Sequence, residues 1–190
     1  MPASHDAPLR DFGETRLESL QRHAFEYFLQ ETNPANGLVA DTSHPGSTAS
    51  IAATGFGLAT YAVGVTRGWM ARADAVERTL ALLRFLRDSP QGPEPDATGY
   101  KGFYYHFLDM STGRRAGRCE LSTVDTTFLL AGVLTAAAFF DGECEEEDEL
   151  RRLAHALYRR AQWTWACNGG ATVTHGWTPE GGFLPYRWEG

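Results

Sequence analysis

The sequence predicts an all-α fold in which helical hairpins stand side by side, and two observations lead to this prediction. Segments with helical spacing of apolar residues alternate between strongly charged and almost uncharged. The two uncharged segments also align with each other at an offset of 72 residues, which pairs Ser50 with Ser122, Thr54 with Thr126 and Phe56 with Phe128. Self-similarity at a fixed offset indicates a repeated supersecondary unit.

Three charged segments are predicted as amphipathic helices that cover the outside of the fold. They span residues 14–30, 72–87 and 145–166, and each places apolar residues on one stripe with charges between them. In the last of them the acidic residues come first and the arginines later, as the helix dipole prefers. Residues 1–13 are predicted as a disordered tail, and residues 14–190 as one domain.

The two uncharged segments, residues 50–65 and 122–140, are predicted as inner helices. Their only charged residue is Asp125, and their many small residues suit close packing on all sides. A solvent-facing helix would need a polar face. These helices are therefore expected to line the inside of the structure.

A glycine followed by hydrophobic residues comes after each charged helix. These positions are Gly37-Leu38-Val39, Gly102-Phe103-Tyr104 and Gly182-Phe183-Leu184. The stretch from Gly102 to Asp109, followed by Met110-Ser111-Thr112-Gly113, predicts a short β-hairpin. All three loops precede an inner-helix position, so they are expected at one end of the molecule, which would form a binding face.

Helical pairs of this kind are typical of an (α/α)6 toroid. A linear helical solenoid is the alternative, but its repeats are shorter, roughly 20–50 residues. About five helices are predicted, which is fewer than six pairs require, so the ring is expected to be incomplete. An open ring would expose its inner helices, and large apolar patches favour association, so self-association is expected.

Composition excludes several classes of protein. The 190 residues are 43% hydrophobic and 22% charged, which excludes wholesale disorder. A net charge of −7 argues against binding to nucleic acid or to an anionic membrane. The three cysteines are far apart and the histidines lack metal-ligand spacing, so we expect no metal and no cofactor. With neither a signal peptide nor an apolar run of about 20 residues, a cytoplasmic location is expected.

Two carboxylates near the loop face are candidates for catalysis. Glycoside hydrolysis uses a pair of carboxyl groups, and Glu120 and Asp125 stand just before and just inside the second inner helix. Asp125 also fits a capping box with Ser122 at the N-cap, so a structural role is the alternative. The equivalent position of the first inner helix is Ala53, so the repeat does not itself require an acid there.

The loops are rich in aromatic residues that could stack on sugar rings, and in side chains that could hydrogen-bond sugar hydroxyls. A structural role, as a lid on the core or as a turn residue, is the alternative for each. The candidate substrate-binding residues are Tyr104, Tyr105, His106, Asp109, Trp177, Tyr186, Arg187 and Trp188.

Four segments, TGYKGFYYHFLDMSTGRR, CELSTVDTTFLLAGVL, ASIAATGFGLATYAVGV and GFLPYRW, resemble the bacterial glycoamylase-like (glucoamylase-like) domain family. That family is similar to the endo-β-1,2-glucanases and to a domain of cyclic β-1,2-glucan synthases. The resemblance extends from about residue 17 to residue 190. It implies an (α/α)6 fold and inverting glycosidase activity on a β-glucan. It also implies several further acidic residues beyond PYRW, where this sequence has only Glu189.

The sequence therefore predicts the N-terminal portion of a glycoside-hydrolase-type domain that acts on a β-glucan. One carboxylic acid of raised pKa would protonate the glycosidic oxygen while a second carboxylate activates water. Glu120 and Asp125 are the expected pair, and an oligo- or polysaccharide is the expected partner. A non-catalytic carbohydrate-binding or structural fragment of such an enzyme is the alternative.

Overall fold

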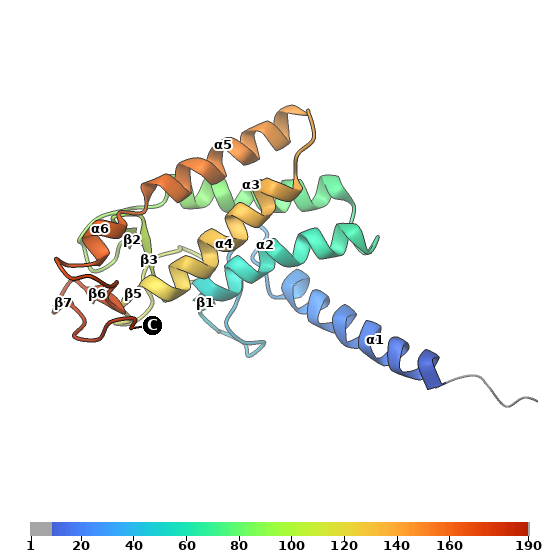
Figure 1. Ribbon diagram of the computed structural model, residues 1–190, viewed down its shortest axis with the longest axis horizontal. Helices are drawn as coiled ribbons and strands as arrows, with labels where there is room; N and C mark the ends of the chain where they lie inside the picture. Colours follow the sequence, from blue (N-terminus) through green and yellow to red (C-terminus); the bar gives the residue numbers. More distant parts are fainter. Residues whose placement is uncertain (1–8, 190) are drawn as a thin grey trace, which may run out of the picture.

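The computed structural model describes the backbone of residues 9–189 and the side chains of residues 16–189. About half of the described chain lies in helices, with two small antiparallel sheets (Figure 1). The helices are α1 (Leu9–Gln30), α2 (Ile51–Thr66), α3 (Arg72–Asp88), α4 (Thr123–Phe139), α5 (Glu145–Arg160) and α6 (Trp163–Ala166). Among these described helices, none is long and apolar enough to cross a membrane.

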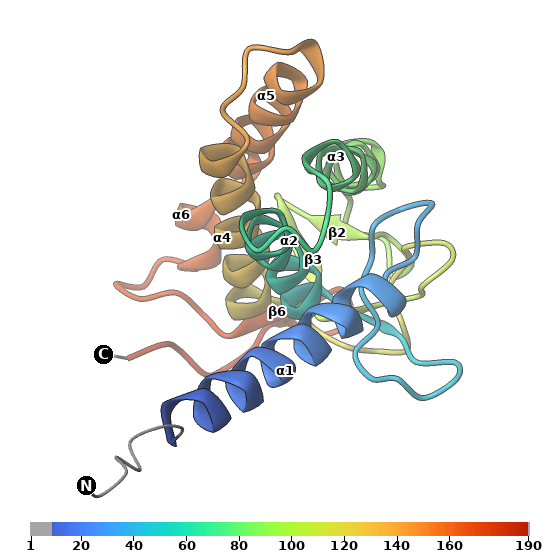
Figure 2. The same cartoon turned by 90° about the vertical axis from the view of Figure 1, so that its right-hand side faces the viewer.

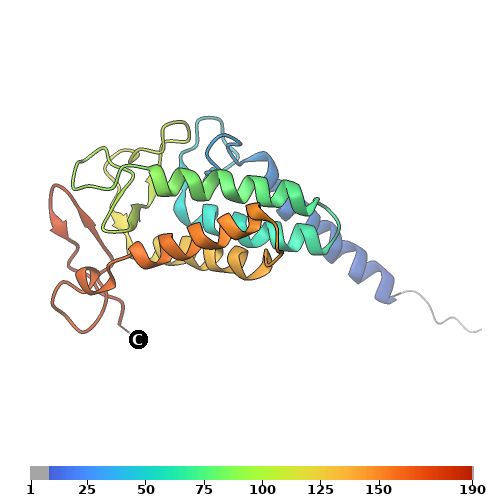
Figure 3. The same ribbon diagram turned by 90° about the horizontal axis from the view of Figure 1, so that it is seen from above.

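The uncharged helices α2 and α4 pack against each other, and the charged helices α3 and α5 form a second pair (Figure 2). Helix α1 contacts α2 on another side, and its N-terminal turns project beyond the bundle (Figures 1 and 3). The approach of α2 to α4 depends on Gly55 and Gly132. A Cβ atom on either glycine would overlap backbone atoms of the opposite helix. The predicted close packing of the inner helices is thus confirmed for this pair.

Two predicted helix boundaries are wrong. The first helix begins at Leu9 and not at residue 14, so the predicted tail is helical from residue 9, and residues 1–8 lie outside the described part. The predicted helix 145–166 is interrupted at Ala161 and Gln162, which separate α5 from α6.

The interruption after α5 has a tertiary cause. The Gln162 N–H donates to the Lys101 carbonyl at 3.0 Å, and Gly102 lies against the Arg160–Ala161 backbone so closely that a Cβ would not fit. The following Trp163 ring lies 5.0 Å from the Phe103 ring. Contacts with the loop at residues 101–103 therefore end α5, and not a signal within the helix itself.

The loops form more sheet than the sequence predicts. One sheet has the strand order β2-β3-β5-β6-β7, and β1 pairs with β4 in a second sheet. The strands are β1 (Ala49–Ser50), β2 (Gly99–Tyr100), β3 (Phe103–Tyr105), β4 (Phe107–Leu108), β5 (Leu121–Ser122), β6 (Gly176–Thr178) and β7 (Gly182–Phe183). The predicted strand 102–109 is thus divided at His106, and its two halves join different sheets. The predicted turn at 110–113 is present, closed by the Leu108–Arg115 bridge.

All seven strands lie at the end of the bundle where α2 and α4 begin (Figure 1). Each inner helix starts directly from a short strand, β1 for α2 and β5 for α4. The predicted gathering of the loops at one end is confirmed. This strand-rich end is where the candidate site residues lie.

Candidate functional site

Three side chains converge where β3, β4, β5 and α4 meet. His106 occupies the single position between β3 and β4, Glu120 directly precedes β5, and Asp125 lies in the first turn of α4. His106 Nδ1 lies 3.0 Å from Glu120 Oε1, and His106 Nε2 lies 3.7 Å from Asp125 Oδ2. One polar atom from each of the three falls within 4.8 Å of the others. We call these residues the triad.

Backbone hydrogen bonds hold the triad in place. The His106 N–H donates to the Glu120 carbonyl at 2.9 Å, and the Ile51 N–H donates to the His106 carbonyl at 3.2 Å. The imidazole also stacks on the Phe107 ring at 4.0 Å and 13°. His106 is therefore tied both to the segment before β5 and to the start of α2.

Asp125 takes part in the N-terminal cap of α4 and also contacts His106 in the triad. Its N–H donates to the Ser122 hydroxyl oxygen at 3.2 Å, as a capping box predicts. The Ser122 hydroxyl donates in turn to Asp125 Oδ2, the same oxygen that faces His106. The cap therefore orients the carboxylate toward the triad.

Contacts within the triad shift the pKa values of His106 and Glu120. The hydrogen bond from His106 holds the pKa of Glu120 below its ordinary value, against the opposing effect of burial. The same hydrogen bond raises the pKa of His106, with the Asp125 charge adding to it and burial opposing it. Side-chain exposures of 32%, 31% and 13% for His106, Glu120 and Asp125 leave the triad within reach of solvent. Glu120 is thus an ionised carboxylate at neutral pH, the opposite of the raised-pKa acid that we expected of one member of the pair.

Tyr104 and Tyr105 are core residues, so the prediction that they stack on sugar is wrong. Both are buried, with exposures of 1% and 0%. The Tyr104 hydroxyl is held by Leu86 and Arg160, and the Tyr105 ring lies under the Arg115 guanidinium at 4.7 Å. Both faces of β3 are covered, because helices and loops pack on the two sides of this sheet.

Asp109, Arg187 and Trp177 also serve the scaffold. Asp109 Oδ1 accepts hydrogen bonds from Ser111 and Thr112, which lower its pKa to about 2 and hold the turn. The Arg187 guanidinium donates to two carbonyls of the 167–172 turn. The half-buried Trp177 packs against Tyr100 and Trp165 in an aromatic cluster. These contacts favour the structural alternative for each residue.

Tyr186 and Trp188 are exposed, as the binding prediction requires, with 68% and 45% of their surface accessible. Trp188 stacks on His175 at 4.0 Å and 23°, and its indole N–H donates to Thr123 Oγ1 at 3.0 Å. An apolar hollow of about 230 Å³ lies between Trp188 and the start of α4, where Val124 precedes Asp125. Sequence reasoning missed His175, because it was weighed only as a metal ligand and not as a stacking partner.

Arg115 is a second residue that the sequence did not single out. Its guanidinium is 1% exposed, pairs with Glu180 at 2.8 Å and donates to the Cys119 carbonyl at 2.7 Å. Glu180, in the turn between β6 and β7, therefore ties the last loop to the loop before β5. The Arg115 charge also contributes to the low pKa of Glu120.

No family model matches the chain. The chain is 29% identical over 165 residues to an exo β-1,2-glucooligosaccharide sophorohydrolase (non-reducing end) of Parabacteroides distasonis. The aligned region covers 83% of this chain and 21% of that protein. A solved structure from Bacteroides uniformis, named as a candidate glucoamylase, has a TM-score of 0.81 and 27% identity, over 93% of this chain and 42% of that one. The resemblance to the glucoamylase-like family is confirmed.

An endo-β-1,2-glucanase from Chitinophaga pinensis, solved with sophorotriose and glucose, has the same fold over the matched region. Its TM-score is 0.79 at 21% identity, with 93% of this chain and 44% of that chain covered. This chain thus spans about a fifth of the curated relative and less than half of these two glucoamylase-like structures.

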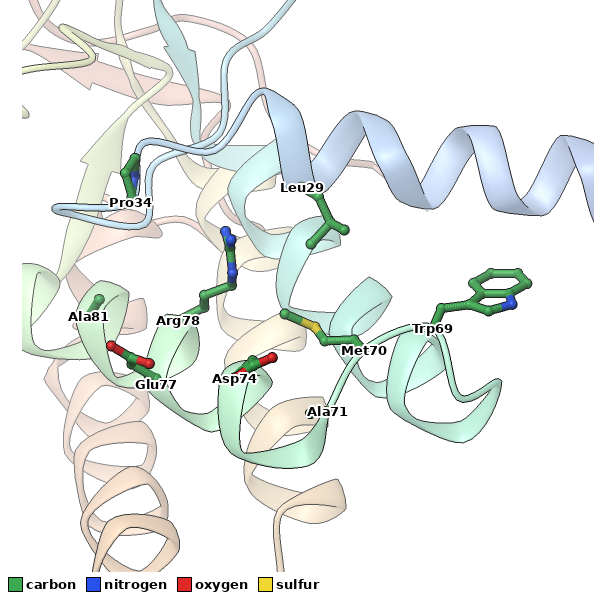
Figure 4. A pocket seen from close by; sticks show the side chains of 9 residues that line it. All are labelled: Leu29, Pro34, Trp69, Met70, Ala71, Asp74, Glu77, Arg78 and Ala81. Atoms are coloured by element: carbon green, nitrogen blue, oxygen red, sulfur yellow. The ribbon is translucent and has the colours of Figure 1, made fainter.

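Another hollow, of about 460 Å³, lies between the end of α1, the α2–α3 turn and α3 (Figure 4). It contains none of the predicted site residues. Its charged lining, Asp74, Glu77 and Arg78, comes entirely from α3. It is separate from the strand-rich end that the glucoamylase-like motifs identify.

Among the described residues, the triad is the group of three side chains that could approach one cation. His106 Nδ1 and Glu120 Oε1 are already hydrogen-bonded to each other. We therefore assign the group as a hydrogen-bonded triad. The predicted absence of a metal stays a prediction.

Proposed function

We propose that this chain contributes the carboxylates of Glu120 and Asp125 to a site that binds and hydrolyses a β-glucan, with β-1,2-linked glucose as the substrate. The observation that carries the proposal is the convergence of the triad at the strand-rich end. The names of the curated relative and of the Chitinophaga structure support β-1,2-linked glucan as the substrate class. Tyr186 and Trp188 supply the exposed rings that sugar binding requires.

The triad favours one of the two chemical roles of a glycosidase carboxylate. An ionised carboxylate activates water or accepts hydrogen bonds from sugar hydroxyls, whereas the general acid needs a raised pKa. Glu120, with its lowered pKa, suits the first role. In inverting enzymes the acid and the base stand roughly 6.5–9.5 Å apart to admit water. Oxygen atoms of Glu120 and Asp125 lie within 4.8 Å, so we place both on one side of the glycosidic bond, with the acid supplied by another residue.

A non-catalytic carbohydrate-binding role is the second candidate. The lowered pKa of Glu120 favours it, because an anion that accepts hydroxyl hydrogen bonds needs no proton to transfer. Trp188 and His175 would bind a sugar face equally well without catalysis.

Incubation of the purified chain with linear β-1,2-glucan separates the candidates. Hydrolysis is followed by the release of oligosaccharides, and binding by titration calorimetry with β-1,2-gluco-oligosaccharides. We expect binding that is lost in Glu120→Gln, with a linear β-1,4-glucan as the control ligand. Cleavage supports the hydrolase, and binding without cleavage supports the binding role. A folded chain that neither binds nor cleaves β-1,2-glucan would contradict both.

We also propose that the chain self-associates through the uncharged helices. Phe56, Val63 and Phe128 are 49%, 47% and 42% exposed, and the two phenylalanine rings lie 5.2 Å apart. We expect light scattering to show dimers or larger species that dissociate in the double variant Phe56→Ser, Phe128→Ser. Tyr158→Ser removes a similarly exposed ring from α5 and is the matched control. A monomer at all accessible concentrations would contradict the proposal.

A further inference from the structure

His106 stands between two carboxylates that come from different elements. Glu120 faces Nδ1 from the segment before β5, and Asp125 faces Nε2 from the first turn of α4. Asp41, on the loop before β1, adds a third negative charge near the ring, and the positive charge of Arg115 acts on Glu120. Each ring nitrogen of His106 therefore faces a carboxylate.

This geometry selects one protonation state of the imidazole. A neutral ring that donates from Nδ1 to Glu120 would direct the lone pair of Nε2 at the Asp125 carboxylate, which is repulsive. The imidazolium instead presents an N–H to each carboxylate, and charge-assisted hydrogen bonds are stronger than neutral ones. The raised pKa of His106 agrees with this state.

The imidazolium also offsets the repulsion between the two carboxylates. Two carboxylates this close repel each other, and without an intervening cation one of them takes up a proton more readily. Because His106 is fixed by its own backbone hydrogen bonds and by the Phe107 stack, it holds both acids at set positions.

We propose that His106 is a positioning residue whose imidazolium holds the Glu120 and Asp125 side chains in place and oriented toward the glucan, and that its ring is not itself a ligand of the sugar. This replaces the predicted hydrogen bond from His106 to sugar hydroxyls. It rests on the proposed function for the identity of the ligand, but the state of the triad does not depend on that ligand.

Nuclear magnetic resonance on the full chain tests the triad directly. We expect long-range proton–nitrogen spectra to show both His106 nitrogens protonated at pH 7, with a titration midpoint above the ordinary 6.5. Glu120→Gln should lower that midpoint more than Asp125→Asn, because the Glu120 hydrogen bond is the larger cause of the shift. A neutral ring at pH 7, or a midpoint unmoved by Glu120→Gln, would overturn the proposal.

The carboxyl side gives a second, independent readout. In His106→Asn the carbon signal of the Glu120 carboxyl should titrate at higher pH than in the unaltered chain, because an amide brings no charge. His175→Asn is the matched control, since His175 is also half-buried and stacked at 4.0 Å but does not contact the triad. An unchanged Glu120 titration in a folded His106→Asn chain would also overturn the positioning role.

Glucan binding by the unaltered chain and by His106→Asn separates this proposal from the proposed function. We expect His106→Asn to weaken binding of β-1,2-gluco-oligosaccharide by at least roughly tenfold, as the loss of charge-assisted hydrogen bonding predicts. Binding that is unchanged in His106→Asn would contradict the orientation of the acids by His106. The expected titrations in a chain that binds no glucan would overturn the proposed function and leave the state of the triad established.

Discussion

The starts of α2 and α4 are built alike but carry different chemistry. Ser50 Oγ accepts from the Ala53 N–H at 3.3 Å, and Ser122 Oγ accepts from the Asp125 N–H at 3.2 Å. One turn later, Thr54 and Thr126 each donate to the carbonyl of their capping serine at 2.7 Å. The two helix starts therefore share the same local hydrogen bonds.

Each of these threonines also ties its helix to a strand-rich loop. Thr54 Oγ1 accepts from the Val39 N–H at 3.1 Å, and Thr126 Oγ1 accepts from the Tyr104 N–H at 3.0 Å. Gly37 and Gly102 lie two positions before Val39 and Tyr104, and both have a positive φ, 74° and 83°. The glycine-then-hydrophobic pattern thus marks where a loop joins an inner helix.

Among the differences between the two starts, two introduce a charge. At the offset of 72, Glu120 corresponds to Thr48 and Asp125 to Ala53. The scaffold forms without either acid in the first unit, so neither acid is required by the fold. This separates residues that build the repeat from residues that are available for function.

The largest expected effect comes from disrupting the close packing of α2 against α4, the inner helices of the two repeated units. Gly132→Ala places a Cβ against the Gly55 carbonyl, which is backbone and cannot rotate away. We expect a loss of about 3 kcal/mol in the free energy of unfolding, measured with urea. Gly57→Ala is the control, because its Cβ would meet only side chains, with Val39 Cγ2 at 3.1 Å, and should change stability by less than about 1 kcal/mol. Equal losses in the two variants would show that close packing is not what joins the units.

A smaller and matched effect is expected at the two threonines. Thr54→Val and Thr126→Val each leave a buried loop N–H without its acceptor, so each should cost about 1–3 kcal/mol. Thr60→Val and Thr135→Val remove hydroxyls that donate only to carbonyls of their own helix, at 2.8 and 2.9 Å, and are the controls. A large loss at one buried threonine and none at the other would contradict the equivalence of the two units.

The smallest expected effect is the pH dependence of the triad, which the first unit lacks. The raised pKa of His106 means that its contribution is fully present below the ordinary 6.5 and is lost as pH rises through its folded value. The lowered pKa of Glu120 means that its contribution is present above the ordinary 4.5 and is lost as pH falls through its folded value. The stability difference between the unaltered chain and His106→Asn should thus be largest near pH 5.5.

Because His106 and Glu120 are about one-third exposed, this difference should stay below about 1 kcal/mol. Urea unfolding at pH 5.5 and pH 8.5 measures it, with His175→Asn as the control. A difference that grows from pH 5.5 to pH 8.5 would have the wrong sign for the triad.

Local patterns predicted most of the helical framework. The spacing of apolar residues located the five long helices, and the capping-box pattern located the N-cap at Ser122, which the structure confirms. The matching cap at Ser50 is seen only in the structure. The break at Ala161 and the burial of Tyr104 and Tyr105 were missed. A strand of three residues is too short for an alternation to show which face is buried, and the break depends on the loop at Lys101.

The sequence by itself determined where the five long helices lie and that Ser122 caps one of them, because those features depend on residues within a few positions of each other. It also determined the repeat of the two uncharged helices, which alignment of the sequence with itself shows directly. Only the tertiary structure decided that His106, Glu120 and Asp125 meet while Asp109 and Arg187 hold turns. The triad forms because β3 pairs with β5, which places Tyr104 opposite Ser122 and brings His106 beside Glu120. That pairing joins residues far apart along the chain, and no local periodicity records it.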